Sequence, residues 1–145
     1  MEEVNKGGRE RRLSPRFEVA LDCRVALPDA ERSSGLLFPD AHLPARTRDL
    51  SETGLGLVAA SIYVGYDCVV DAGRTLLVVL EAPRGAIELK ATAVHYTRID
   101  AKDEEVAYSL GLLISEMTEQ NRALYAELLR ELGLTKDSNT AEGPR

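Results

Sequence analysis

Apolar and polar residues alternate along the stretch FEVALDCRVAL, and this alternation restricts the fold more than any other feature of the sequence. The apolar side chains of the segment from Phe17 to Leu27 share one face, while Glu18, Asp22 and Arg24 share the other. Because successive side chains of a β-strand point to opposite faces, this period of two predicts a half-buried strand over residues 17–27.

Further segments continue the β pattern, each separated from the next by turn-forming residues. Residues 45–60 predict a strand, a turn and a second strand, with Asp49, Ser51 and Gly54 in the turn. The other predicted strands cover residues 74–81, 86–99 and 106–114. The alternation changes parity at Val94, which indicates a bulge or bend in that strand. About six strands with intervening turns predict a small antiparallel barrel or sandwich.

The period of the apolar residues becomes helical towards the C-terminus. The leucines that recur at helical intervals are Leu124, Leu128, Leu129 and Leu132. Thr118 is a suitable N-cap and Gly133 a suitable end, so the pattern predicts an amphipathic helix over residues 118–133. One apolar stripe on such a helix is typical of packing against a domain, and we expect this helix to pack on the barrel.

The remaining segments predict loops and ends without regular structure. Residues 28–44 contain prolines, a glycine and a serine pair, and predict a long loop. Residues 100–105 are charged and predict a hairpin loop. We expect residues 1–8 to be flexible and the polar tail 134–145 to be disordered.

Composition indicates a single soluble domain of 145 residues. No apolar run approaches the roughly 20 residues of a membrane span, and the first eight residues contain no apolar signal region. We therefore expect a cytoplasmic protein without membrane insertion. The formal net charge is −6, and an acidic body disfavours nucleic acid as a partner.

Neither the cysteines nor the histidines show the paired spacing of a metal site. Cys23 and Cys68 each lie in an apolar neighbourhood and predict reduced thiols. His42 and His95 have no cysteine or histidine at a ligand spacing, so no metal is expected. His95 lies in an apolar strand and predicts a structural histidine.

The stretch RERRLSPR concentrates four arginines ahead of the first strand. Arg12 and Arg16 form an R-x-x-x-R pair, and Pro15 disfavours a helix there. A basic segment on an acidic protein suits a small anion, although a solvated basic tail has the same composition.

About thirty residues further on, DLSETG gives a D-x-S-x-x-G pattern through Asp49, Ser51 and Gly54. In this order, around a first alternating strand, the two motifs resemble the PilZ-domain family, whose members bind the bacterial second messenger cyclic di-GMP. The following GLGL and the late YSLGLLI are also similar to that family. The resemblance covers residues 9–133 and implies an all-β fold with a C-terminal helix, a six-stranded antiparallel PilZ-like β-barrel.

The resemblance also implies roles for individual residues. Residues 9–16 would form a ligand-binding arm, residues 17–117 the barrel and residues 118–133 the helix. Arg12 and Arg16 would contact guanine and phosphate of cyclic di-GMP. Arginine suits both, because it pairs bidentately with phosphate and with the O6/N7 edge of guanine.

On the barrel, Asp49 and Ser51 would recognise a guanine edge, since a carboxylate offers two acceptors to the N1–H and N2–H₂ donors. Gly54 would hold the turn. Arg11, next to the first motif arginine, would favour a stacked pair of ligands. Thr53 stands where a second glycine is frequent in the family.

Three further arginines, Arg9, Arg46 and Arg48, either enlarge the positive surface or are simply solvated. Arg48 adjoins Asp49, and neighbouring strand residues point to opposite faces, so we expect Arg48 to point away from the ligand.

The resemblance therefore implies a single-domain cyclic di-GMP receptor that changes conformation on binding and signals to a protein partner. An enzyme is not expected, because Ser51 lacks a nucleophile elbow and GLGL falls in a strand. The alternative is a PilZ-fold adaptor that acts without ligand through protein contacts, for which the Leu124/Leu128/Leu132 stripe is a candidate. The sequence does not identify the partner or the pathway.

Overall fold

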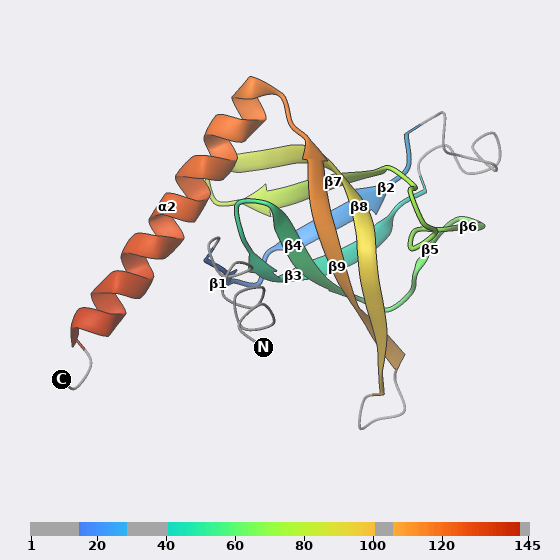
Figure 1. Ribbon diagram of the computed structural model, residues 1–145, viewed down its shortest axis with the longest axis horizontal. Helices are drawn as coiled ribbons and strands as arrows, with labels where there is room; N and C mark the ends of the chain where they lie inside the picture. The colour runs from blue at the N-terminus through green and yellow to red at the C-terminus, as the bar shows by residue number, and fades with distance from the viewer. Residues whose placement is uncertain (1–14, 29–40, 101–105, 143–145) are drawn as a thin grey trace, which may run out of the picture.

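Six antiparallel strands close into a barrel (Figure 1). The computed structural model describes residues 15–28, 41–100 and 106–142. The barrel strands are β2 (Asp22–Ala26), β3 (Leu43–Leu50), β4 (Gly54–Ala59), β7 (Leu76–Ala82), β8 (Gly85–Asp100) and β9 (Val106–Glu116). They pair in the order β3-β2-β7-β8-β9-β4, and pairing of β3 with β4 closes the ring. The predicted six-stranded antiparallel barrel is confirmed.

The first predicted strand is divided in two. A short β1 (Phe17–Glu18) and then β2 pair along the same strand, β3, and residues 19–21 separate them. The buried Thr47 of β3 fills this break with its side chain. Its hydroxyl accepts a hydrogen bond from Leu21 N at 2.8 Å and donates one to Val19 O at 2.5 Å. The backbone groups Leu21 N and Val19 O therefore keep hydrogen-bond partners despite the break in the strand.

A small hairpin that the sequence pattern did not predict follows β4. Its strands are β5 (Tyr63–Val64) and β6 (Asp67–Cys68), with Gly65 at a φ of 61° in the turn. The backbone of Val69 donates a hydrogen bond to Ile62 O at 2.8 Å, which holds the base of the hairpin. Val64 and Val69 are buried, so the hairpin contributes to the core.

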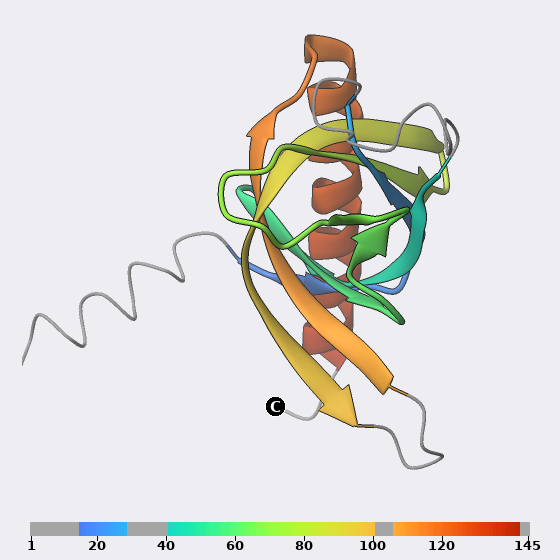
Figure 2. The same cartoon turned by 90° about the vertical axis from the view of Figure 1, so that its right-hand side faces the viewer.

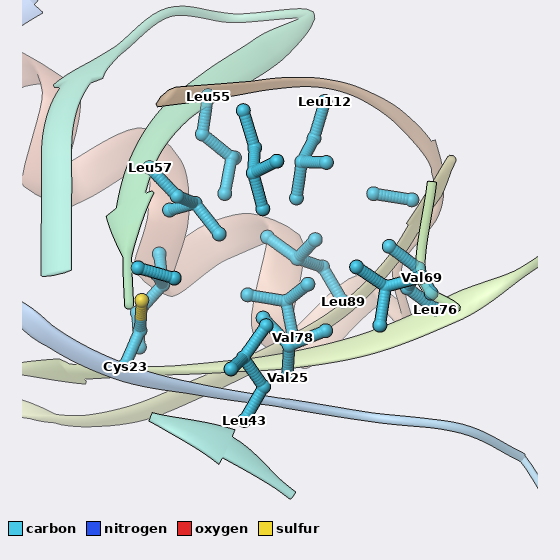
Figure 3. Close-up of a cluster of buried hydrophobic side chains, with 14 of the residues drawn as sticks. Cys23, Val25, Leu43, Leu55, Leu57, Val69, Leu76, Val78, Leu89 and Leu112 are labelled. Carbon is cyan, nitrogen blue, oxygen red and sulfur yellow. The ribbon is translucent and has the colours of Figure 1, made fainter. Parts of the chain in front are cut away.

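Leucine and valine side chains from all six barrel strands fill the interior (Figure 3). The fully buried side chains include Val25, Leu57, Val78, Leu89 and Leu110. Cys23 lies at the edge of the same cluster, and burial raises the pKa of its thiol to about 12. A thiol with so high a pKa stays protonated at neutral pH, and both cysteines are free, as expected.

The predicted bulge in the long strand is present. Ala93 pairs with Leu112 and His95 with Gly111, so Val94 is an extra residue in β8. Beyond the bulge, β8 and β9 continue as a two-stranded ribbon that projects from the barrel (Figure 2). All six residues from Val94 to Ile99 are exposed.

Helix α2 (Glu119–Glu142) lies along one side of the barrel (Figures 1 and 2). Thr118 caps it as predicted, since its hydroxyl accepts a hydrogen bond from Asn121 N at 3.2 Å. Asn121 Oδ1 also accepts from Glu88 N at 2.9 Å and ties the helix start to β8. The predicted leucine stripe packs against the core, with Leu128 only 6% exposed.

The predicted helix end at Gly133 is wrong, because α2 continues to Glu142 and includes most of the tail expected to be disordered. Gly133 does not adopt a positive φ, which a glycine that ends a helix requires. The next proline, Pro144, lies beyond the helix and so does not interrupt it. Among the described residues, no helix is long and apolar enough to span a membrane.

Replacing Gly133 by alanine is expected to stabilise the protein. A Cβ at this position would lie 3.6 Å from the Phe17 ring, an ordinary van der Waals contact. Glycine inside a helix loses more backbone entropy on folding than alanine, so Gly133→Ala should raise the free energy of unfolding by about 0.5–1 kcal/mol. Urea denaturation measures the change.

Gly73→Ala is the matched control, because a Cβ there also has space but the backbone has a φ of +76°. This variant should be destabilised by about 1 kcal/mol through left-handed strain. A Gly133→Ala protein no more stable than the wild type would contradict a continuous helix through residue 133.

Candidate functional site

A bulge in β3 turns Asp49 to the outside of the barrel. Thr47 pairs with Leu57 and Asp49 pairs with Gly56, so Arg48 is an extra residue relative to β4. In a strand without this bulge, the alternation that buries Thr47 would also point Asp49 inward. The bulge therefore places a carboxylate on the outer face.

Arg48 lies on the same side as Asp49, so the expectation that it points away is wrong. Its Nε lies 3.5 Å from Asp49 Oδ2, and its guanidinium also donates a hydrogen bond to the Ser109 hydroxyl. Strict alternation fails here because a bulge gives two successive residues similar directions.

Arg16 also contacts the Asp49 carboxylate. Its Nη1 donates a hydrogen bond to Asp49 Oδ1 at 2.9 Å. The Asp49 side chain is 15% exposed, whereas that of Arg16 is 61% exposed. Asp49 is thus held between an arginine of the motif arm and an arginine of its own strand, one on each oxygen. The structure brings together two residues that lie 33 positions apart in the sequence.

Ser51 and Gly54 form the turn that follows β3. Ser51 N donates to Gly54 O at 2.9 Å, and Gly54 N donates to Ser51 Oγ at 3.1 Å. Ser51 is only 3% exposed, so its hydroxyl serves the turn and faces no solvent. A Cβ on Gly54 would lie 2.5 Å from Leu112 O on β9, which explains the need for glycine.

The helix supports this turn from behind. The buried Tyr125 donates a hydrogen bond from its hydroxyl to Ser51 O at 2.7 Å. Burial raises the pKa of Tyr125 well above its usual range, so the donor proton is retained at all ordinary pH values. No sequence motif indicates this contact, since 74 positions separate the partners.

A groove of about 580 Å³ lies along β3, beside Arg48. It is lined by Glu18, Val19, Ala20, Arg46, Thr47, Arg48 and Val58. Arg46 bonds Asp22 Oδ1 at 3.1 Å, and both side chains are largely exposed. The lining therefore combines apolar residues with two arginines and the acidic Glu18, and the volume is within the range of small-molecule sites.

The other arm arginines, Arg9, Arg11 and Arg12, lie outside the described residues, as does most of the 28–44 loop. Within the described part of the chain, no cluster of three or more His, Cys, Asp or Glu side chains could hold a metal ion.

Comparisons with known proteins identify the family. The family model for the PilZ domain matches residues 10–131. The chain belongs to the PilZ family. No curated protein sequence matches it.

Solved structures share the PilZ fold at low sequence identity. The PilZ domain of Escherichia coli YcgR with c-di-GMP has a TM-score of 0.63 and 13% identity, covering 92% of this chain and 99% of that one. The K. pneumonia MrkH–c-di-GMP complex has a TM-score of 0.64 and 15% identity, covering 89% and 55%. The Bacillus subtilis inhibitor of motility MotI/DgrA has a TM-score of 0.58 and 17% identity, covering 87% and 52%. This chain thus spans about half the length of the MrkH and MotI chains.

Removing the Tyr125 hydroxyl is expected to destabilise the protein. The Tyr125→Phe variant leaves Ser51 O without its buried donor, which should lower the free energy of unfolding by about 1–3 kcal/mol. Urea denaturation followed by circular dichroism measures the loss.

Tyr63→Phe is the matched control, because Tyr63 is 52% exposed and its hydroxyl group should contribute less than about 0.5 kcal/mol. If the two variants lost the same stability, the support of the turn by the helix would be disproved.

Proposed function

We propose that this PilZ domain is a receptor for cyclic di-GMP. The observation that carries the proposal is the ion pair between Arg16 and Asp49, close to a groove whose lining includes Arg48, the neighbour of Asp49. It joins the R-x-x-x-R arm to the D-x-S-x-x-G turn at one point on the surface. The YcgR and MrkH structures, which contain c-di-GMP, have the same fold and support the choice of ligand.

The chemistry of the proposed site is an exchange of partners. Both Asp49 oxygens face arginines in this structure, and the same two acceptors match the N1–H and N2–H₂ donors of guanine. A guanine at Asp49 would displace Arg16, whose guanidinium would then pair with a phosphate of the same ligand. The Arg16 side chain is 61% exposed and so is free to move to the phosphate, while Arg48 stays beside the Asp49 carboxylate.

Arg11 and Arg12 would complete the arm. We propose that Arg12 contacts guanine and phosphate together with Arg16, and that Arg11 favours a second stacked ligand. Ser51 and Gly54 would act differently from Asp49: their burial supports a role in holding the turn that aims the carboxylate. Arg48 joins the proposed ligand contacts because it lies beside the carboxylate.

The signal would leave through helix α2 to an unidentified protein partner in the cytoplasm. The helix contacts both halves of the site, since Tyr125 bonds the turn at Ser51 and Gly133 lies against Phe17, the neighbour of Arg16. Movement of the arm therefore changes a contact with the helix. In this proposal the domain binds and signals without catalysing a reaction.

The alternative is an adaptor that acts without ligand. The leucine stripe is a poor docking surface for it, because Leu128 is 6% exposed and Leu124 and Leu132 pack against the core. An adaptor would need another surface, and the binding experiment separates the two functions.

Calorimetric titration with cyclic di-GMP tests the receptor proposal. The wild-type protein should bind saturably, and Arg16→Ala and Asp49→Asn should each weaken binding by about tenfold or more, the usual loss when a charge-assisted hydrogen bond is removed. The stoichiometry, one or two ligands per chain, tests the role proposed for Arg11.

Arg24→Ala is the matched control, because Arg24 is 52% exposed and pairs with Glu81 away from the groove. It should bind like the wild type, and GTP should give no comparable heat. Absence of binding by the wild-type protein at about 100 µM ligand, a concentration about a hundredfold above a micromolar Kd, would disprove the receptor proposal and favour the adaptor.

A further inference from the structure

Four residues form a row across the outer face of the barrel, one on each of four neighbouring strands. Asp49 of β3 pairs with Gly56 of β4, Gly56 pairs with Gly111 of β9, and Gly111 pairs with His95 of β8. Residues directly opposite each other in a sheet share a face. The row therefore has a carboxylate at one end, an imidazole at the other and two glycines between them.

A bulge produces each end of this row. Arg48 is the extra residue that turns Asp49 outward, and Val94 is the extra residue that does the same for His95. Ile87, Leu89 and Ala91 are buried, and continuing their alternation would have pointed His95 towards the interior. His95 is instead exposed on the outer face, although the sequence placed it in an apolar strand as a structural histidine.

The two end side chains occupy the space that the glycines leave. A Cβ on Gly56 would lie 2.8 Å from Asp49 Oδ1. A Cβ on Gly111 would lie 2.3 Å from His95 Nε2 and within 2.8 Å of two further ring atoms. The carboxylate thus lies over Gly56, together with the Arg48 guanidinium, whose Nη2 would lie 3.0 Å from the same Cβ, and the imidazole lies over Gly111. Because paired strands are about 4.8 Å apart, the two groups are neighbours on the surface.

We propose that His95 is a second base-reading residue of the site, which selects guanine over adenine. This inference rests on the proposed cyclic di-GMP receptor function and adds a residue that neither motif contains. The edge of guanine carries, in order, the O6 acceptor, the N1–H donor and the N2–H₂ donor. Asp49 accepts from the two donors, and an imidazole N–H beside it donates to O6.

Adenine reverses this pattern. Its amino group lies where guanine has O6, and its unprotonated N1 would face the Asp49 carboxylate. Asp49 alone already disfavours adenine, and His95 increases the preference through a donor that only O6 can accept. A histidine that merely filled the space over Gly111 would leave the base preference unchanged.

Titrations of four proteins with cyclic di-GMP and with cyclic di-AMP test the inference. The proteins are the wild type, His95→Ala, His95→Gln and the matched control Thr97→Ala, an exposed residue two positions along β8. His95→Ala should weaken cyclic di-GMP binding by about tenfold and reduce the preference for guanine by a similar factor, as expected for one lost hydrogen bond. His95→Gln, whose amide also donates, should stay within about threefold of the wild type.

The outcomes separate this inference from the receptor proposal. A wild-type protein that binds neither ligand disproves both. A wild type that binds cyclic di-GMP, with His95→Ala binding just as tightly and just as selectively, overturns only the role of His95. Equal losses in His95→Ala and Thr97→Ala also overturn it, since the effect would then belong to the strand.

Gly111→Ala tests the placement of the ring without changing His95. The three atoms nearest to the new Cβ all belong to the ring of the exposed His95, so the variant should fold while the imidazole is displaced. It should weaken cyclic di-GMP binding by about as much as His95→Ala, and the double variant should lose no more than either single one. Additive losses would show that the two residues act independently and would contradict the inference.

Discussion

Strand β3 is the element on which both the closure of the barrel and the geometry of the site depend. It pairs with β1 and β2 along one edge and with β4 along the other, so the ring closes only through it. The same strand carries the extra residue Arg48 that turns Asp49 outward. A slip of one residue between β3 and β4 would return the carboxylate to the interior, where an unpaired charge is costly.

The sequence pattern predicted a small antiparallel barrel or sandwich because its strands alternate clearly and the turns contain characteristic residues, and the resemblance to the PilZ family selected the barrel. The bulge in β8 was also predicted, since the run from Ile87 to Ala93 is long enough to establish which residues face inward before the alternation changes parity. The bulge in β3 was not, because the segment is short and polar on its outer side. The prediction that Arg48 and Asp49 point to opposite faces of the strand was therefore wrong.

Features that depend on how distant segments pair in the sheet could not be predicted from the sequence. The Asp49–Arg16 contact follows from two motifs, but nothing local indicates that Gly56 and Gly111 are partners in the sheet. The hydrogen bond from Tyr125 to Ser51, which joins the helix to the turn, was not predicted for the same reason. Ser51 belongs to the same motif as Asp49, yet Ser51 is buried in the turn whereas Asp49 lies on the outer face of the barrel.

The row formed by Asp49, Gly56, Gly111 and His95 also limits which residue types can occupy these positions in the family. The space over Gly111 is filled by the His95 ring from the next strand, and the space over Gly56 by the side chains of Asp49 and Arg48. A larger residue at the position of Gly111 leaves no room for an imidazole from the position of His95, and the same holds for Gly56 and Asp49. Residue types at these two pairs of positions should therefore covary among PilZ domains, although about 16 positions separate the first pair in sequence and seven the second.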